Sequence, residues 1–128
     1  MKTSPTQRSL KFLRESGWTV QVVEHWNAFA RRRIDVFHFG DIIGVNPELP
    51  DAKPTLFQVT SGANVSARLA KAREHAGPLT AWVLSGGRLQ IHGWQKRGPR
   101  GQRKAWTVRI LEVGLAELNT LDSVKDAT

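Results

Sequence analysis

Cysteine is absent from the 128 residues, so the chain has neither a disulfide nor a thiolate metal ligand. No apolar run approaches the roughly 20 residues that a membrane-spanning helix needs. The segment after Met1 is polar and lacks the apolar core of an export signal. We therefore expect a cytoplasmic protein rather than a secreted, disulfide-stabilised or membrane-embedded one.

Acidic residues are few beside basic ones. Asp and Glu number 11 against 19 Lys and Arg, which gives a formal net charge of +8. Such an excess on a small domain favours a polyanionic partner, because neutralised phosphates release their condensed counterions. RNA, ribosomal partners and anionic membranes fit the same charge as well as DNA does. The charge thus indicates a class of partner and no reaction.

Several familiar site motifs are also missing. There is no glycine-rich nucleotide fingerprint and no Walker loop. The four histidines, His25, His38, His75 and His92, do not have the spacing of a zinc site. The sequence gives no reason to expect a nucleotide-binding or zinc-dependent protein.

Periodicity and turn residues predict one α/β domain, with a core at about residues 5–95 and a C-terminal strand and short helix at about 105–122. Predicted helices span residues 4–17, 64–75 and 115–121. Predicted strands span residues 18–26, 34–39, 41–45, 55–61, 80–84, 89–95 and 106–113. Residues 34–45 form either two short strands or one strand bent at Gly40, and Gly77-Pro78 should end the second helix. This order predicts a mixed sheet with helices on its faces.

Three polar residues are expected to meet on one hairpin. Strands 41–45 and 55–61 are joined by a proline-rich loop, and centring the hairpin on that loop places Asp41 opposite Gln58. Side chains alternate along a strand, so Gln58 and Thr60 share one face. Spacing alone favours the simpler interpretation that Asp41 begins a strand and Gln58 is polar at a sheet edge.

The same residues can also form a metal site. Mg²⁺ and Mn²⁺ prefer oxygen ligands, which Asp41, the Gln58 side chain and the Val59 carbonyl would supply. Glu24 lies in an apolar strand, where a charge is costly unless it is paired or bound to a metal, so it is a further candidate ligand. Asp35 is an alternative acid that ranks lower, because the same register places it beyond the strand's end.

The segment Arg-Ile-Asp-Val-Phe-His-Phe-Gly-Asp-Ile-Ile-Gly-Val, followed after a loop by Leu-Phe-Gln-Val-Thr-Ser-Gly, resembles the PD-(D/E)XK nuclease superfamily. The likeness is to its small phage-type and Holliday-junction-resolvase-like members, over roughly residues 8–95. It implies a restriction-endonuclease-like αβββαβ core, with a central mixed sheet flanked by helices. It also implies an Mg²⁺- or Mn²⁺-dependent DNA endonuclease that hydrolyses phosphodiester bonds, from a phage or mobile element in a bacterial or phage-infected cell.

Carried over by position, Asp41 matches the superfamily's metal-binding aspartate and Gln58 matches its Glu/Gln position. Thr60 stands where the superfamily has its catalytic lysine, and a threonine supplies no positive charge. Some members place that lysine on the following helix, so Lys71 and Arg68 are candidate catalytic replacements. A solvated helix face is the equally open alternative for both.

Two basic segments are the candidate DNA-binding surfaces. Their residues are Arg31, Arg32, Arg33, Lys96, Arg97, Arg100, Arg103 and Lys104. Residues 96–104 contain no acid, so they favour an arm along a phosphate backbone over a merely solvated loop. Phosphate contacts position DNA without distinguishing bases, so DNA structure or ends should be recognised. The tryptophans mostly lie in predicted strands, so core packing is their default role; Trp26 and Trp94, if exposed, could instead stack on bases.

Two other functions remain open. Gln58 replaces a glutamate and Thr60 replaces a lysine of the superfamily motif. Both replacements favour a catalytically weakened or inactive nuclease-fold protein that serves as a DNA-binding accessory. An RNA-binding or ribosome-associated protein is the third. A homodimer would suit the nuclease, because cutting two strands needs two sites.

Overall fold

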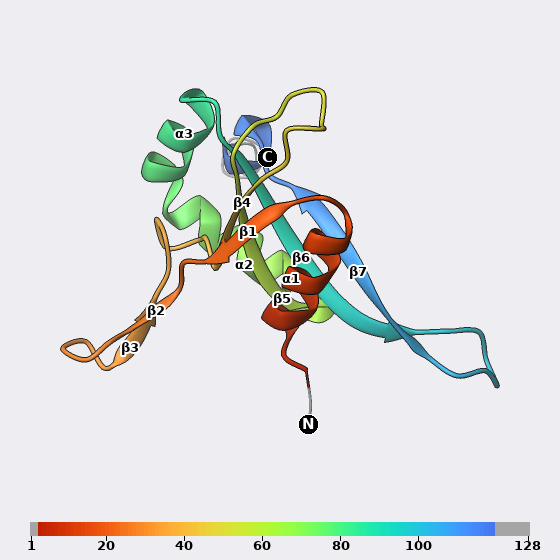
Figure 1. Ribbon diagram of the computed structural model, residues 1–128. Helices are drawn as coiled ribbons and strands as arrows, with labels where there is room; N and C mark the ends of the chain where they lie inside the picture. The colour runs from red at the N-terminus through yellow and green to blue at the C-terminus, as the bar shows by residue number, and fades with distance from the viewer. Residues whose placement is uncertain (1–2, 120–128) are drawn as a thin grey trace, which may run out of the picture.

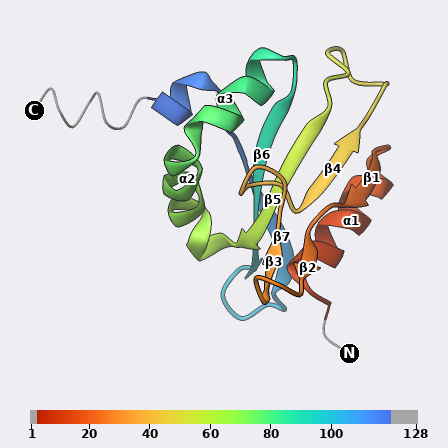
Figure 2. The ribbon, with the colours of Figure 1, turned by 90° about the vertical axis from the view of Figure 1, so that its left-hand side faces the viewer.

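The computed structural model describes residues 3–119, and its centre is a five-stranded mixed sheet in the order β1-β4-β5-β6-β7 (Figure 1). The strands of this sheet are β1 (Thr19–Val22), β4 (Ile42–Val45), β5 (Thr55–Ser61), β6 (Arg88–Arg97) and β7 (Ala105–Glu112). The helices are α1 (Pro5–Glu15), α2 (Val65–Glu74), α3 (Ala76–Leu84) and the 3-10 turn η1 (Gly62–Asn64). Helix α1 covers one face of the sheet, and α2 and α3 cover the other (Figure 2). The predicted α/β class, a mixed sheet flanked by helices, is confirmed.

Helix α1 begins where the sequence places its cap. The Ser4 hydroxyl accepts from the Gln7 N–H, and the Gln7 side chain accepts from the Ser4 N–H, which forms a capping box. Pro5 occupies the first helical turn, where its missing N–H costs nothing. The helix ends before Gly17, whose φ of +93° suits a residue without Cβ. Leu13 on its inner face enters the core.

The strand connections set the sheet direction. β1, β4 and β5 are successive antiparallel neighbours, and the helical segment after β5 returns the chain to β6, which runs parallel to β5. The β4–β5 register pairs Ile42 with Phe57 and Ile43 with Leu56, so paired residue numbers sum to 99. The predicted hairpin register is therefore confirmed.

Two apolar clusters fix the orientation of β5. Leu56 packs with Leu79 in the cluster beneath α2 and α3, whereas Phe57 and Val59 pack with Leu13 beneath α1. Since side chains alternate along a strand, the polar residues after Leu56 at every second position face α2 and α3. Burial on both faces explains why six of the seven β5 residues are buried.

The predicted strand at residues 80–84 is wrong, because these residues belong to α3. Gly77-Pro78 does not end the helical region; Pro78 lies in the first turn of α3, where helices tolerate proline. Helix α2 ends at Glu74, just before α3 starts. A short apolar run such as residues 79–84 suits either a buried strand or a buried helix, so the hydrophobic pattern alone does not distinguish the two.

The predicted strand at residues 34–39 is also wrong. The chain makes a tight turn in which Phe37 and His38 have φ values of +55° and +58°, and the Val36 N–H donates to the Gly40 carbonyl. Gly40 allows this turn to touch the sheet, since a Cβ there would lie 2.8 Å from a methyl carbon of Leu56.

The predicted single strand at residues 18–26 divides into β1 and β2 (His25–Asn27). β2 pairs with β3 (Arg32–Ile34) in a separate two-stranded ribbon that projects from the molecule (Figure 1). The C-terminal helix predicted at residues 115–121 is present over residues 115–119, and its remaining part lies outside the described residues. None of the helices in residues 3–119 is long and apolar enough to cross a membrane.

Candidate functional site

Asp41 lies directly before β4 and is held by hydrogen bonds of its backbone and of its carboxyl. Its N–H donates to the Phe57 carbonyl at 2.9 Å. Its Oδ2 accepts from the Val59 N–H at 2.8 Å and from the Gln58 Nε2 at 3.3 Å. Only 5% of the residue is exposed. The hairpin register therefore brings the predicted Asp41 and Gln58 into direct contact and holds the carboxyl in one orientation.

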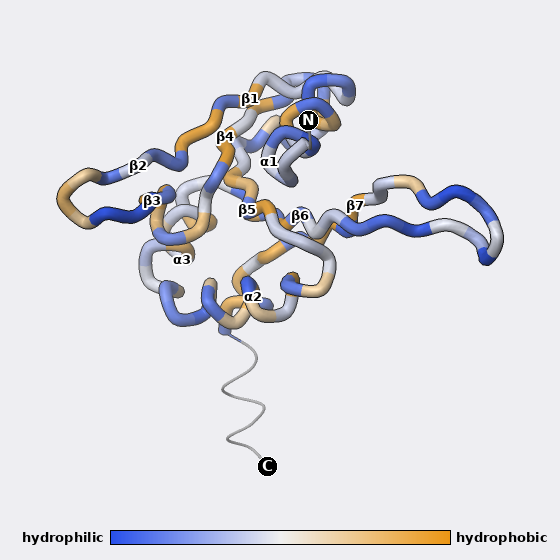
Figure 3. Tube along the Cα trace, turned by 90° about the horizontal axis from the view of Figure 1, so that it is seen from below, coloured by the Kyte–Doolittle hydropathy of each residue, from blue (hydrophilic) through white to orange (hydrophobic). Residues whose placement is uncertain are grey.

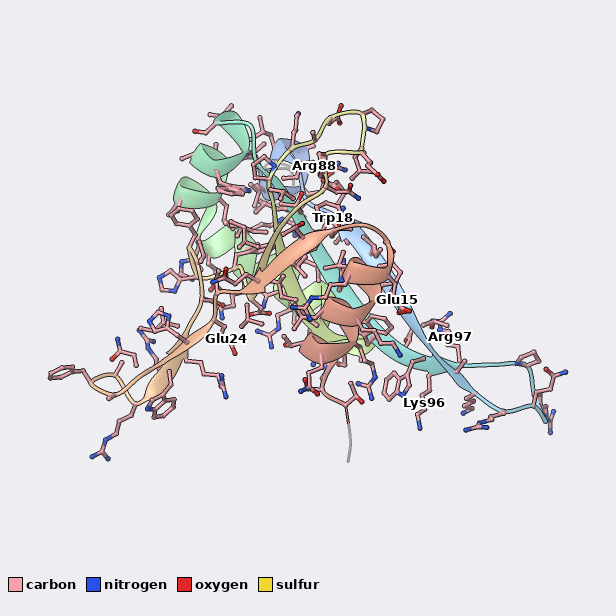
Figure 4. The ribbon with its side chains drawn as sticks, viewed as in Figure 1. Glu15, Trp18, Glu24, Arg88, Lys96 and Arg97 are labelled. Carbon is pink, nitrogen blue, oxygen red and sulfur yellow. The ribbon has the colours of Figure 1, made fainter. Side chains whose placement is uncertain are left out.

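Glu24 joins this pair from the segment between β1 and β2, at the root of the β2–β3 ribbon (Figure 4). Its side chain lies close enough to the Asp41 carboxyl to raise the pKa of that group. The Glu24 N–H donates to the Asp41 carbonyl at 3.4 Å, and the Val23 N–H donates to the same carbonyl at 2.9 Å. Glu24 Oε1 also pairs with Arg33 Nη1 at 3.3 Å. The three proposed metal ligands Asp41, Gln58 and Glu24 thus lie together.

The Asp41 carboxyl is an unusually weak acid here. Its pKa is raised from 3.8 to about 7, and burial is the largest cause. The interactions with Glu24 and the charge of Asp35 contribute to the rise, and the hydrogen bond from the Val59 N–H opposes it. The charged groups that shift this pKa are the acids Glu24 and Asp35. The exposed Arg33 pairs with Glu24 and not with Asp41, so a divalent cation would add positive charge at the Asp41 carboxyl.

The candidate ligand atoms are all oxygens, the type of ligand that a hard cation prefers. Two carboxylates and a side-chain amide oxygen match what Mg²⁺ takes from proteins, the rest coming from water and phosphate. The Gln58 side chain now donates its Nε2 to Asp41. Rotation of the amide by about 180° would place its oxygen there instead, as a ligand for the cation. Within residues 3–119 no group of three or more His, Cys, Asp or Glu is placed to hold a metal. The site therefore relies on the Asp41–Glu24 pair.

Thr60 and the candidate cations of α2 lie on the same side of the sheet as this pair. Thr60 is 6% exposed and shares the face of Gln58 on β5. Arg68 and Lys71 are half-buried on α2, which contacts β5 and β6. In the described part of the chain, no ion pair or hydrogen bond joins either of them to Asp41 or Glu24. The replacement of the missing lysine remains a prediction.

The eight predicted DNA-binding residues lie on two projecting hairpins. Arg31, Arg32 and Arg33 belong to the β2–β3 ribbon, and residues 96–104 span the end of β6 and the loop to β7. All eight are exposed. The two hairpins project in opposite directions and are strongly hydrophilic along their basic stretches (Figure 3). Both basic segments are thus accessible to a polyanion.

A cation–aromatic cluster at the base of the β6–β7 hairpin was missed by sequence reasoning. The Arg8 guanidinium lies 3.6 Å from the ring centre of Trp106, which is 44% exposed, and Lys96 Nζ lies 5.4 Å from it. No local pattern joins Arg8 to a residue so distant in sequence. Trp26 is exposed, whereas Trp94 is buried in the core, which is the default role expected for the tryptophans, and cannot stack on bases.

Trp94 instead belongs to a buried network. Its Nε1 donates to the Ser9 hydroxyl at 2.7 Å, and that hydroxyl meets the His92 Nδ1 at 2.9 Å. Ser9 and His92 are both 0% exposed, so this serine–histidine pair cannot reach a substrate. Burial lowers the pKa of His92 to about 4, which keeps the ring neutral. The network ties α1 to β6.

Comparison of the chain with protein-family models, curated proteins and solved structures finds no match. Its chemistry therefore has to be inferred from its own residues. Those residues provide a buried aspartate beside a second, partly exposed acid and an amide, and two exposed basic hairpins on the same small domain. An anionic backbone and a divalent cation are the two ligands that these features suit together.

Proposed function

We propose that this chain is a metal-dependent DNA endonuclease or resolvase-like enzyme of the PD-(D/E)XK superfamily, which hydrolyses phosphodiester bonds with Mg²⁺ or Mn²⁺. The observation that carries the proposal is the buried Asp41 beside the partly exposed Glu24 and the buried Gln58. Burial and the nearby acids Glu24 and Asp35 raise the pKa of Asp41 to about 7. Perturbed acids of this kind gather at functional sites, because folding alone gains nothing from them.

The order of the elements supports the same family. A helix, three antiparallel strands, helical segments and a parallel fourth strand follow the αβββαβ order of the restriction-endonuclease-like core. The β2–β3 ribbon would be an insertion between the first and second strands of that core. The motif residue Asp41 then directly precedes the second strand of that core, and Gln58 lies in the third.

Each residue has a separate role in this proposal. Asp41 and Glu24 would hold the ion, together with the Gln58 side-chain oxygen. When bound, the ion activates a water and stabilises charge on the phosphate. The Val59 N–H keeps the Asp41 carboxyl oriented. Thr60 adds no charge, so Lys71 or Arg68 would have to turn toward the phosphate and supply it.

DNA would be held by its backbone. The arginines of the β2–β3 ribbon and the basic residues 96–104 would contact phosphates on either side of the site. Such contacts favour recognition of DNA structure or ends. Two copies acting as a homodimer would cut both strands of a duplex.

The direct test is cleavage of supercoiled, linear and branched DNA with Mg²⁺ or Mn²⁺ by the wild type and by Asp41→Asn. Asparagine keeps the shape and the two accepted hydrogen bonds but removes the charge, so we expect a loss of at least about 100-fold, as for other key electrostatic groups. Asp51→Asn, an exposed acid in the β4–β5 loop, is the matched control and should cleave normally. Equal cleavage by Asp41→Asn would contradict the proposed site.

A second candidate is a catalytically weakened DNA-binding accessory protein of the same fold. The observation that favours it is the uncharged Thr60 beside an Asp41 whose pKa of about 7 leaves it half-protonated at neutral pH. Calorimetry separates the two candidates. Salt-sensitive DNA binding without detectable Mn²⁺ binding indicates the accessory role, whereas Mn²⁺ binding that Asp41→Asn abolishes indicates the enzyme. Preference for RNA over DNA would contradict both.

A further inference from the structure

The β2–β3 ribbon is a hairpin with a defined tip. Its strands pair His25 with Ile34 and Asn27 with Arg32, which leaves four residues, 28–31, in the turn. The Asn27 Oδ1 accepts from the Ala30 N–H at 2.9 Å and holds the turn. The shape of the tip is therefore set within the hairpin.

An apolar aromatic side chain sits at this tip with nothing packed against it. Phe29 is 102% exposed, the highest of the exposed large hydrophobic residues in the described chain, and Trp26 behind it is 59% exposed. Burying a phenylalanine is among the larger apolar gains available to a side chain. Phe29 makes no such gain in the folded chain, so only a binding partner can provide it.

The charge of the hairpin indicates the chemistry of that partner. Residues 25–34 contain three arginines and no acid. Only Arg33 of the three forms an ion pair among the described residues, with Glu24. Guanidinium groups beside an aromatic tip match DNA, where phosphates flank stacked bases. A membrane surface fits less well, because the second basic hairpin has no large apolar residue in its loop, residues 98–104.

The hairpin also has a suitable reach. Three residue pairs and a turn extend roughly 15 Å at about 3.3 Å per residue, which exceeds the roughly 7.5 Å depth of the minor groove. Its root is fixed at Asp41, whose carbonyl accepts from the Val23 and Glu24 N–H groups. The tip can therefore enter a groove about four or five base pairs from the acid pair, at roughly 3.4 Å per pair.

We propose that Phe29 is a wedge that enters a DNA base step while the neighbouring arginines hold the phosphates, and that the chain thereby selects DNA with weakened stacking. Opening a base step costs free energy, and it costs least where the stack is already interrupted. A nicked duplex is hence preferred over an intact one. The proposal rests on the proposed function for its partner, DNA, but requires no cleavage.

The test uses a short duplex with 2-aminopurine beside a single nick, and the same duplex without the nick, in EDTA so that no cleavage occurs. The proteins are the full chain, Phe29→Ala, Phe29→Leu and the control Leu84→Ala, whose side chain is 71% exposed on α3. Wild type should brighten the 2-aminopurine and bind the nicked duplex about tenfold more tightly. Phe29→Ala should lose both effects with an unchanged Tm, Phe29→Leu should keep most of them, and Leu84→Ala should match wild type.

The outcomes separate this proposal from the nuclease. If Phe29→Ala retains the brightening and the preference for the nick, the wedge is wrong, even where DNA binding and cleavage are intact. If unstacking depends on Phe29 but no metal ion supports cleavage, the wedge stands and the nuclease fails. If the wild type ignores DNA and binds phosphatidylserine vesicles through Phe29, both are wrong.

Discussion

Asp41→Asn should stabilise the protein at neutral pH. The unfolded aspartate ionises at its ordinary pKa of 3.8, whereas the folded one ionises at about 7. The folded state therefore holds a proton that the unfolded state releases, and this contribution to stability is full below 3.8 and is lost as the pH rises through 7. Each pKa unit is worth about 1.4 kcal/mol, so the charged carboxylate costs roughly 4 kcal/mol at and above neutral pH.

Asparagine removes the cost of the buried charge and keeps the hydrogen bonds of the site. Its oxygen can accept from the Val59 N–H and the Gln58 amide as Oδ2 does now, and its own amide can donate to Glu24. We expect the variant to unfold with a free energy higher than wild type by up to about 4 kcal/mol at pH 7.5. At pH 4 the two proteins should agree to within about 1 kcal/mol, because the folded wild-type carboxyl is then protonated and the pH lies only just above the unfolded pKa of 3.8.

His92 adds a second signature with the opposite sign. Its pKa falls from 6.5 to about 4 on folding, so its contribution to stability is full above 6.5 and is lost as the pH falls through 4. The loss is on the order of 3 kcal/mol. In wild type it nearly cancels the slope from Asp41, so stability should change little between pH 4 and 7. In Asp41→Asn only the His92 slope remains, and stability should rise with pH.

Urea unfolding followed by tryptophan fluorescence at several pH values measures these terms, in EDTA to keep divalent ions out. Asp51→Asn is the control and should stay within about 0.5 kcal/mol of wild type throughout, as exposed substitutions do. An Asp41→Asn protein no more stable than wild type at pH 7.5 would refute the reasoning. It would mean that the buried carboxyl has a compensating charge.

Four further predictions use the same structure. Thr60→Lys should restore the missing charge and raise Mn²⁺-dependent cleavage by about 100-fold, the scale of one transition-state electrostatic contact, as measured on supercoiled DNA. Mn²⁺ should raise the Tm of wild type but not of Asp41→Asn in a thermal-shift assay, since it binds only the folded acid pair. Arg100→Ala should weaken binding to all DNA sequences alike and lower the slope of log affinity against log salt by about 1, measured by fluorescence anisotropy. Leu79→Ala, which empties a fully buried position under α3, should lower the unfolding free energy by about 2–5 kcal/mol in urea titration.

The hairpin that carries the candidate site was predictable because two local signals agree. The proline-rich loop marks the turn, and the alternating pattern of β5 fixes which side chains share a face. Together they placed Asp41 opposite Gln58, as the register pairs beside them show. The costly position of Glu24 in an apolar segment also identified it before its contact with Asp41 was known.

Other features depend on interactions that no local pattern encodes. Phe37 and His38 occupy left-handed backbone conformations that few side chains adopt, so an apolar run there was mistaken for a strand. His38 stacks on His75, with ring centres 4.3 Å apart, across a separation that sequence cannot reveal. Ser9 meets His92 across 83 positions for the same reason.

The carbonyl of Asp41 is the anchor point of the β2–β3 ribbon, through the N–H groups of Val23 and Glu24. Both donors precede the ribbon itself, so a version of the chain trimmed within residues 25–34 would keep them. Such a shortened protein should retain its acid pair and its thermal stability. The appendage and the domain beneath it could then be exchanged or redesigned separately.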